Sequence, residues 1–303
     1  MIQQAPANPK EIALVPKWLQ YFFMIDTHAH LDFPEFQNDL PEILTRAREA
    51  GVRRIISIGT TLASSRAAVA LAEKHEEVFA TVGIHPNNAA ESSGEDIEAL
   101  ETLCSHPKVV AIGEIGLDYY RLPSRSERKG NVSGALLAQT PQELELATQD
   151  GAEINAQKEV FQAQLDLAAR SGLNVVIHQR DSFADTLEII EPYTNKLRGV
   201  FHCFGGDSDD AQRISDMGHL VSFTGIITFK NAPVVRETAA SIPDGSFMIE
   251  TDCPYLAPVP HRGKRCEPAY VSEVAKKLAE VRGVSVEQIT EQTTATANAF
   301  FRF

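Results

Sequence analysis

Short apolar runs and amphipathic helical segments alternate along the chain, and this order constrains the fold more than any other feature. Each apolar run is continuous rather than alternating with polar residues, which is typical of parallel strands buried on both faces. The expected strands are Phe23–His28, Arg53–Ile58, Val78–Ile84, Val109–Gly113, Asn174–His178, Gly199–His202, Leu220–Phe223 and Phe247–Glu250.

Segments with helical periodicity follow the strands, and a last one, Val286–Phe303, is expected to form a closing helix. The other expected helices are Leu40–Ala50, Ser64–Lys74, Ile97–Ser105, Gln157–Ser171, Phe183–Glu191, Asp209–Met217 and Val234–Ala240. Eight strands in βα order predict an α/β fold, a closed (β/α)8 TIM barrel, and 303 residues suit one such domain. An open doubly wound sheet is the alternative, although no Gly-x-Gly-x-x-Gly turn follows the first strand.

Two segments lie outside the plain repeat and define the expected domain organisation. Residues 1–23 form an N-terminal extension, and residues 24–303 form a single barrel domain. An insertion at 121–154 follows the fourth strand, with a short helix expected at Pro141–Ala147 because Thr140 and Glu143 have the spacing of a capping box. Insertions at this end of a barrel strand lie over the active-site face, so we expect a lid or a cleft wall, with a mobile surface loop as the alternative.

Composition narrows the class of partner. A net charge of −13 argues against a broad nucleic-acid footprint, which needs many Lys and Arg side chains, but it leaves room for local contact with DNA at a metal site. No apolar stretch reaches the length of a membrane span, and no signal peptide is recognisable. We therefore expect a cytoplasmic monomer with no membrane contact and no obligatory protein partner.

Histidines and carboxylates gather at the predicted strand ends. His28 and His30 form a His-x-His pair at the end of the first strand, and further candidates follow five later strands. These later residues are His85, Glu114, His178, His202 and Asp252. All strand ends of a TIM barrel converge on one mouth, so these side chains are expected to meet there.

Four of these histidines and the two carboxylates suit a pair of divalent ions. We expect His28, His30, Glu114 and Asp252 to hold one ion, and Glu114, His178 and His202 to hold the other. Imidazole and carboxylate ligands are compatible with Mg²⁺, Mn²⁺ or Zn²⁺. Two such ions can activate a water molecule and polarise a phosphoryl oxygen, with Asp252 and Glu114 as the catalytic carboxylates.

The motifs that contain these residues resemble those of the TatD family of metal-dependent deoxyribonucleases, within the amidohydrolase-like barrel superfamily. They are Asp26-Thr27-His28-Ala29-His30-Leu31, Gly83-Ile84-His85-Pro86, Gly113-Glu114-Ile115-Gly116-Leu117-Asp118-Tyr119-Tyr120, Ile177-His178-Gln179-Arg180-Asp181, His202-Cys203-Phe204-Gly205-Gly206, Glu250-Thr251-Asp252-Cys253-Pro254-Tyr255-Leu256-Ala257-Pro258 and Asn298-Ala299-Phe300. The resemblance implies a TIM barrel with a divalent-metal site and hydrolytic activity on DNA, including 3′→5′ exonuclease activity.

Four further residues are candidates for substrate binding. The resemblance suggests this role for His85 and for the segment that contains His261 and Arg262, which belong to a basic cluster with Lys264 and Arg265. Arg262 has the geometry to clamp a phosphate with two hydrogen bonds, although a solvated run of charges would look the same. Arg180 is the fourth candidate, either as a phosphate contact or as an ion-pair partner of its neighbour Asp181.

Two other functions fit the same fold. A metal-dependent amidohydrolase or lactonase acting on a small molecule would have nearly the same barrel and metal site. A metal-stabilised scaffold without catalytic activity is the third hypothesis, but structural metal sites are usually closed, whereas a barrel mouth is open. The basic cluster favours a phosphate-containing substrate, so we expect a deoxyribonuclease.

Overall fold

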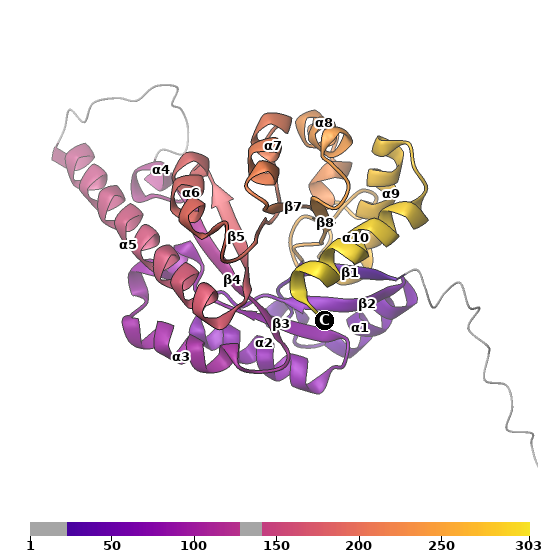
Figure 1. Ribbon diagram of the computed structural model, residues 1–303, viewed down its shortest axis with the longest axis horizontal. Coiled ribbons are helices and arrows are strands. Elements are labelled where there is room, and N and C mark those ends of the chain that lie inside the picture. Colours follow the sequence, from indigo (N-terminus) through magenta and orange to yellow (C-terminus); the bar gives the residue numbers. More distant parts are fainter. Residues whose placement is uncertain (1–22, 128–140) are drawn as a thin grey trace, which may run out of the picture.

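The structure, a computed structural model, describes residues 23–127 and 141–303, and its framework is a parallel eight-stranded sheet (Figure 1). The strands are β1 (Met24–Ala29), β2 (Val52–Ser57), β3 (Val78–Val82), β4 (Val109–Asp118), β5 (Asn174–Arg180), β6 (Gly199–Phe201), β7 (Leu220–Phe223) and β8 (Phe247–Ile249). They are paired in sequence order from β1 to β8. The predicted TIM barrel and its eight strands are confirmed.

The first and last strands meet along a seam of hydrogen bonds. The Thr27 hydroxyl donates to the carbonyl of Ile249 at 3.0 Å. Nearer the mouth, the amide of Asp252 donates to the carbonyl of His28, and the amide of His30 donates to the carbonyl of Cys253, both at 2.9 Å. The seam therefore closes the barrel at the level of the His-x-His pair and brings Asp252 beside it.

Helices surround the strands (Figure 1). They are α1 (Leu40–Glu49), α2 (Leu62–Lys74), α3 (Gly94–Cys104), α4 (Pro123–Glu127), α5 (Pro141–Ser171), α6 (Phe183–Ile190), α7 (Ser208–Asp216), α8 (Pro233–Ser241), α9 (Val271–Arg282) and α10 (Val286–Phe301). Short 3₁₀ turns include η3 (Pro86–Glu91), η5 (Gly225–Thr228) and η6 (Pro268–Tyr270). All the helices expected around the barrel are present, and α4 and α9 are additional helices that were not predicted.

The segment between β4 and β5 differs from the prediction. The short helix expected at Pro141–Ala147 and the helix expected at Gln157–Ser171 are one continuous helix of 31 residues, α5. The Gln157 amide side chain bonds the backbone N–H and C=O of Asp118, and Gln164 bonds those of Ile84 in the same way. Helix α5 thus supports the ends of two mouth strands. Residues 1–22 and 128–140 lie outside the described residues, so the N-terminal extension and the lid stay predictions.

Two hydrophobic clusters hold the barrel together. The larger one packs the outer faces of the strands against the surrounding helices. The smaller one takes one or more side chains from each of the eight strands, among them Ile25, Val176 and Met248, and packs them against Phe300 and Phe301 of α10. A set drawn from every strand can only lie inside the barrel, so α10 covers the floor, opposite the mouth.

Candidate active site

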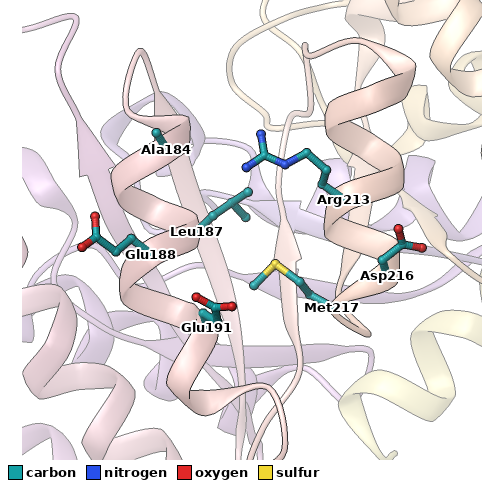
Figure 2. Close-up of a pocket in the computed structure, with 7 residues that line it drawn as sticks. All are labelled: Ala184, Leu187, Glu188, Glu191, Arg213, Asp216 and Met217. Atoms are coloured by element: carbon teal, nitrogen blue, oxygen red, sulfur yellow. The ribbon is translucent and has the colours of Figure 1, made fainter.

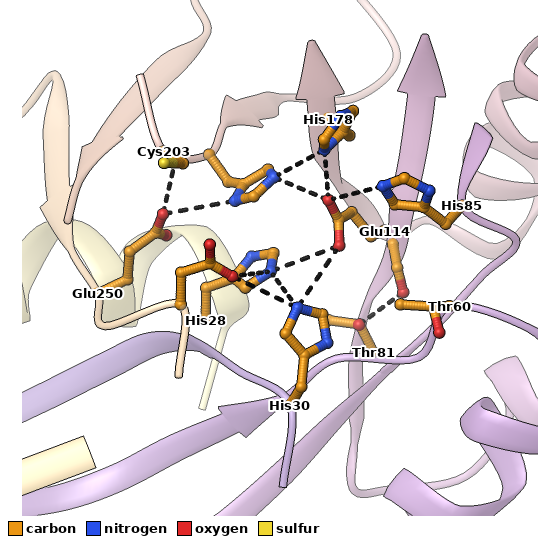
Figure 3. Close-up of polar contacts among 12 residues, drawn as sticks. His28, His30, Thr60, Thr81, His85, Glu114, His178, Cys203 and Glu250 are labelled. Atoms are coloured by element: carbon orange, nitrogen blue, oxygen red, sulfur yellow. Dashed lines mark hydrogen bonds and ion pairs between the residues drawn. The ribbon is translucent and has the colours of Figure 1, made fainter. Parts of the chain in front are cut away.

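Seven side chains from the ends of six strands converge at the mouth (Figure 3). They are His28, His30, His85, Glu114, His178, His202 and Asp252. Each is largely or fully buried, and His28 and Glu114 are 0% and 2% exposed. These residues were predicted to meet at the mouth, and the structure brings all of them together.

Glu114 occupies the centre of this cluster. Its Oε1 lies 2.7 Å from His178 Nδ1 and 2.8 Å from His202 Nε2. Its Oε2 faces the other side, 3.5 Å from His28 Nε2 and 3.9 Å from His30 Nε2. The carboxylate therefore presents one oxygen to each pair of histidines, which is the arrangement that a ligand shared by two ions requires.

Asp252, which follows β8, lies beside the two histidines of β1, His28 and His30. Its Oδ1 lies 3.4 Å from His30 Nε2 and 3.7 Å from His28 Nε2, and these two ring nitrogens are themselves 3.3 Å apart. Imidazole nitrogens and carboxylate oxygens that converge so closely fit a divalent cation, which prefers this mixture of ligands. His28, His30 and Asp252 form one group that could hold an ion.

His85 lies deeper than a residue on the rim of a substrate cleft would. Its Nε2 is 3.4 Å from Glu114 Oε1, and its ring meets that of His178 edge-to-face, 4.4 Å between centroids. With Glu114 and His178 it forms a second group able to hold an ion. The structure thus places His85 among the candidate ligands.

The charges at the mouth depend on one another. Burial alone would raise the pKa of Glu114, but the charges of His202 and His85 and hydrogen bonds from His178 and His202 hold that pKa well below its usual value. Burial would likewise lower the pKa of His202, yet the carboxylate of Glu114 raises it well above its usual value. Protons on imidazoles balance the carboxylate, and a metal ion would displace them because histidine binds metals in its neutral form.

The backbone at the mouth adopts uncommon conformations. Asp252 has a φ of 57° and Cys203, next to His202, has a φ of 50°, both in the left-handed region that non-glycine residues seldom occupy. Gly116 has a φ of 134°, and a Cβ there would come within 2.1 Å of the carbonyl oxygen of His178. Such strain concentrates at functional sites, where the surrounding structure holds it in place.

Arg180 stacks on an aromatic side chain at the rim. Its guanidinium carbon lies 3.7 Å from the centroid of the Tyr120 ring, and Tyr120 is 52% exposed. The alternative pairing with Asp181 is not formed, because the Asp181 carboxylate binds Arg125 instead. Arg180 and Tyr120 together present a cation and an aromatic face beside the cluster.

The predicted basic cluster after β8 does not contact the histidines. The His261 ring stacks on Tyr270 with 3.9 Å between centroids, and the guanidinium of Arg262 lies 3.8 Å from the centroid of Phe229. Arg265 binds the carboxylate of Asp39 through two hydrogen bonds of 2.9 and 2.6 Å. Of this cluster, exposed Arg262 and Lys264 are left to face solvent.

Three buried carboxylates near the cluster were not predicted as site residues. Asp118 contacts His178, Glu250 contacts His202, and Asp26 accepts hydrogen bonds from the amide and hydroxyl of Thr251. Burial raises the pKa of Asp26 to about 8, against the bonds from Thr251. All three stand inside the strand-end motifs, so a carboxylate at a buried strand end was the signal that could have identified them.

A hollow elsewhere on the barrel offers no comparable chemistry. Figure 2 shows it between α6 and α7, with a volume of about 410 Å³. It is lined by Ala184, Leu187, Glu188, Glu191, Arg213, Asp216 and Met217. This lining includes neither histidine nor cysteine, so the catalytic chemistry belongs to the mouth. Within the described part of the chain, no helix is both long and apolar enough to cross a bilayer.

A TIM barrel with clustered His, Glu and Asp side chains at its mouth defines a metal-dependent hydrolase of the amidohydrolase-like type, and the clusters are consistent with a two-metal site. The family model described as "TatD related DNase" matches residues 25–302. The chain belongs to the TatD family of metal-dependent hydrolases.

Named relatives and a solved structure agree with this assignment. The chain is 36% identical to the uncharacterized metal-dependent hydrolase YabD of Bacillus subtilis, covering 92% of this chain and 99% of the relative. It is 33% identical to the 3′-5′ ssDNA/RNA exonuclease TatD of Enterobacter lignolyticus, covering 92% and 98%. The crystal structure of the TatD homologue YjjV from Escherichia coli is similar with a TM-score of 0.78 at 28% identity, covering 92% and 98%.

Proposed function

We propose that this chain is a divalent-metal-dependent exonuclease that hydrolyses the phosphodiester bonds of DNA from the 3′ end. The observation that carries the proposal is the carboxylate of Glu114 between two pairs of histidines, with Asp252 beside one pair. The name of the relative from Enterobacter lignolyticus, a 3′-5′ ssDNA/RNA exonuclease, supports this choice of substrate.

In this proposal the six residues predicted from the sequence are the ligands. His28, His30, Glu114 and Asp252 would hold one ion, and Glu114 with His178 and His202 would hold the other. When bound, the two ions would supply Lewis-acid stabilisation of the phosphoryl oxygens and activation of the attacking water. Mg²⁺, Mn²⁺ and Zn²⁺ all suit this ligand set.

Asp252 is the residue that we assign to proton transfer. Burial would raise the pKa of its carboxyl group, but a hydrogen bond from His30 and the charges of His28 and His202 lower it below its usual value. The side chain therefore remains a carboxylate at neutral pH and can accept a proton. It also keeps 14% of its surface accessible, whereas Glu114 keeps 3%, so it is the carboxylate that a water molecule can reach.

Arg180 and Tyr120 are suited to bind the substrate. A guanidinium can pair with a phosphate through two parallel hydrogen bonds, and an exposed tyrosine ring can stack on a base. The stacked pair at the rim offers both contacts at neighbouring points. Arg262, exposed on the segment after β8, is assigned a second phosphate contact, whereas the stacking of His261 on Tyr270 leaves it the role of supporting that segment.

The test is a cleavage assay on labelled oligonucleotides. Purified protein is incubated with 5′-labelled and 3′-labelled single-stranded DNA or RNA, with Mg²⁺, Mn²⁺ or EDTA, and the product ladder is read. We expect stepwise shortening of the 5′-labelled strand and immediate release of labelled mononucleotide from the 3′-labelled strand, with either metal and not with EDTA. The Asp252→Asn variant should be slower by about 10²–10⁴-fold, the range for loss of a general base.

Two outcomes would contradict the proposal. Wild-type rates in Asp252→Asn would show that Asp252 takes no part in the proton transfer. If no oligonucleotide is cleaved with any metal, and the protein hydrolyses a lactone or an amide in a metal-dependent reaction, the natural substrate of this site would be a small molecule.

A further inference from the structure

Two of the histidines at the mouth are backed by a second carboxylate. Asp118 Oδ2 lies 3.3 Å from His178 Nε2, while the other nitrogen of that ring faces Glu114 at 2.7 Å. Glu250 Oε1 lies 3.5 Å from His202 Nδ1, while the other nitrogen of that ring faces Glu114 at 2.8 Å. Each imidazole therefore lies between an outer carboxylate and the shared one, and Figure 3 shows His178 in contact with the shared carboxylate of Glu114.

Both outer carboxylates are themselves held rigidly, and each is 1% exposed. Asp118 Oδ1 accepts the backbone N–H groups of Tyr120 and Arg121 at 2.9 and 3.3 Å, which leaves Oδ2 for the histidine. Glu250 accepts the backbone N–H of Cys203 at 2.7 Å and the hydroxyl of Ser222 at 2.6 Å. These bonds fix the orientation of each carboxylate toward its ring.

The other pair of histidines has no such support. In residues 23–127 and 141–303, the Nδ1 atoms of His28, His30 and His202 are all buried without a hydrogen-bond partner. The Nδ1 of His202 nevertheless has the Glu250 carboxylate 3.5 Å away as an ion-pair partner, whereas the Nδ1 atoms of His28 and His30 form no ion pair. Their Nε2 atoms contact the carboxylates of Glu114 and Asp252. A nitrogen of His28 also lies within 4.8 Å of a Glu250 oxygen, a longer approach than the 3.5 Å contact of Glu250 with His202. The two halves of the site thus differ in whether a carboxylate contacts the outer nitrogen of each candidate ligand.

We propose that Asp118 and Glu250 are positioning residues for one of the two cation positions, the one formed by Glu114, His178 and His202. A carboxylate that accepts the outer N–H of a ligating imidazole fixes its tautomer and ring orientation and makes the inner nitrogen a better ligand. Because Asp118 and Glu250 make their ion-pair contacts with His178 and His202, their removal acts mainly on the ion that these two rings would hold. This inference rests on the two-metal site of the proposed function, but not on the substrate.

The experiment is a titration of chelator-treated protein with Mn²⁺ in the absence of nucleic acid, monitored by isothermal calorimetry. We expect two ions per wild-type chain. In Asp118→Asn and in Glu250→Gln, the dissociation constant of one ion should rise by about 10–100-fold, the range for loss of such a partner, and that of the other should stay within about twofold. Asp181→Asn is the matched control, since it removes a carboxylate at the same mouth that contacts Arg125 and no histidine.

A double-mutant comparison identifies the ion that is weakened. Asp118→Asn should add no further loss of binding when introduced into His178→Ala, but it should keep its full effect in His28→Ala. Circular dichroism of the metal-free variants checks that each one is folded. Equal weakening of both ions, unchanged affinities, or an effect as large in Asp181→Asn would overturn the inference. Fewer than two ions on the wild type would overturn it together with the proposed function, whereas inactivity on nucleic acid with the expected affinities would affect the proposed function alone.

Discussion

The two ends of the barrel differ in composition and in role. The mouth contains buried charges and strained backbone, with Glu114 surrounded by histidines and Asp252 at a positive φ. The floor is apolar, since Phe300 and Phe301 of α10 close it against side chains from all eight strands. Buried charges and strained residues cost stability, whereas buried aromatic rings stabilise a fold. The difference indicates that the floor holds the barrel together while the mouth is organised for chemistry.

The largest expected effect is at the mouth. Glu114→Gln removes the shared negative charge between two ion positions while keeping the shape of the side chain. Loss of metal-centred stabilisation, several kcal/mol, should lower the rate of hydrolysis by about 10³-fold or more. The measurement is the initial rate on a labelled oligonucleotide, with the urea midpoint as a control for folding. A variant with wild-type rate and unchanged metal content would contradict the role given to Glu114.

The next largest effect is at the floor, where a substitution should lower stability and leave activity nearly unchanged. Phe300 is 1% exposed, and Phe300→Ala leaves a cavity that should lower the free energy of unfolding by about 3–5 kcal/mol. Hydrolysis per folded molecule should change by less than about twofold, because the ring lies at the end of the barrel opposite the site. Urea unfolding and rates measured well below the transition test this. Phe300→Leu, which keeps most of the volume, should lose much less stability, and a large loss of activity in folded Phe300→Ala would break the separation of the two ends.

The smallest effect concerns a histidine at the floor. His219 precedes β7, and its Nδ1 accepts the backbone N–H of Gly199 at 2.9 Å. Burial, and then the charge of Arg198, lowers the pKa of His219 from 6.5 to about 4. The unfolded chain binds the proton at the higher pKa, so the stability from neutral His219 is fully present above pH 6.5 and is lost as the pH falls toward 4.

His219→Asn keeps a hydrogen-bond acceptor for Gly199 but does not titrate. Its free energy of unfolding should fall less steeply than that of the wild type between pH 6.5 and 4, by up to about 1.4 kcal/mol per pH unit. Urea unfolding at several pH values gives the slope of the free energy of unfolding against pH for each protein. Contributions from the titrating groups that both proteins share cancel in the difference between the two slopes. Parallel slopes would show that His219 does not bind its proton differently in the folded and unfolded states.

The same contrast explains what could be predicted from the sequence. The strands were predictable because both their faces are buried, which gives a continuous apolar run. The first half of α5 has no comparable pattern of buried apolar residues, since residues 148–153 are mostly exposed and contain Gly151. The single helix was therefore predicted as two. Helix α9 was missed although its buried residues Val271, Val274, Ala275 and Leu278 follow helical spacing and Gly283 ends it at a φ of 66°.

At the site, the sequence was enough to predict which residue types would meet, but not what lies behind each ring. Whether Asp118 and Glu250 reach the outer nitrogens of His178 and His202 depends on the stagger of neighbouring strands. The β4–β5 register shifts between Ile112 and Ile115, on either side of Glu114, and such irregularities cannot be read from alternation. The positions of Arg180 and His261 depended likewise on their aromatic partners. Arg180 stacks on Tyr120, which is distant in the sequence, and His261 stacks on Tyr270, further along the same segment.

The central claim is that the mouth holds two divalent ions that share the carboxylate of Glu114. Electron paramagnetic resonance of the protein loaded with two equivalents of Mn²⁺ tests it most directly, because two manganese ions joined by one ligand couple their spins. The account predicts a coupled two-manganese signal in the wild type and in Phe300→Ala, and its loss in Glu114→Gln. Isolated-ion signals alone in the wild type, at full loading, would contradict it.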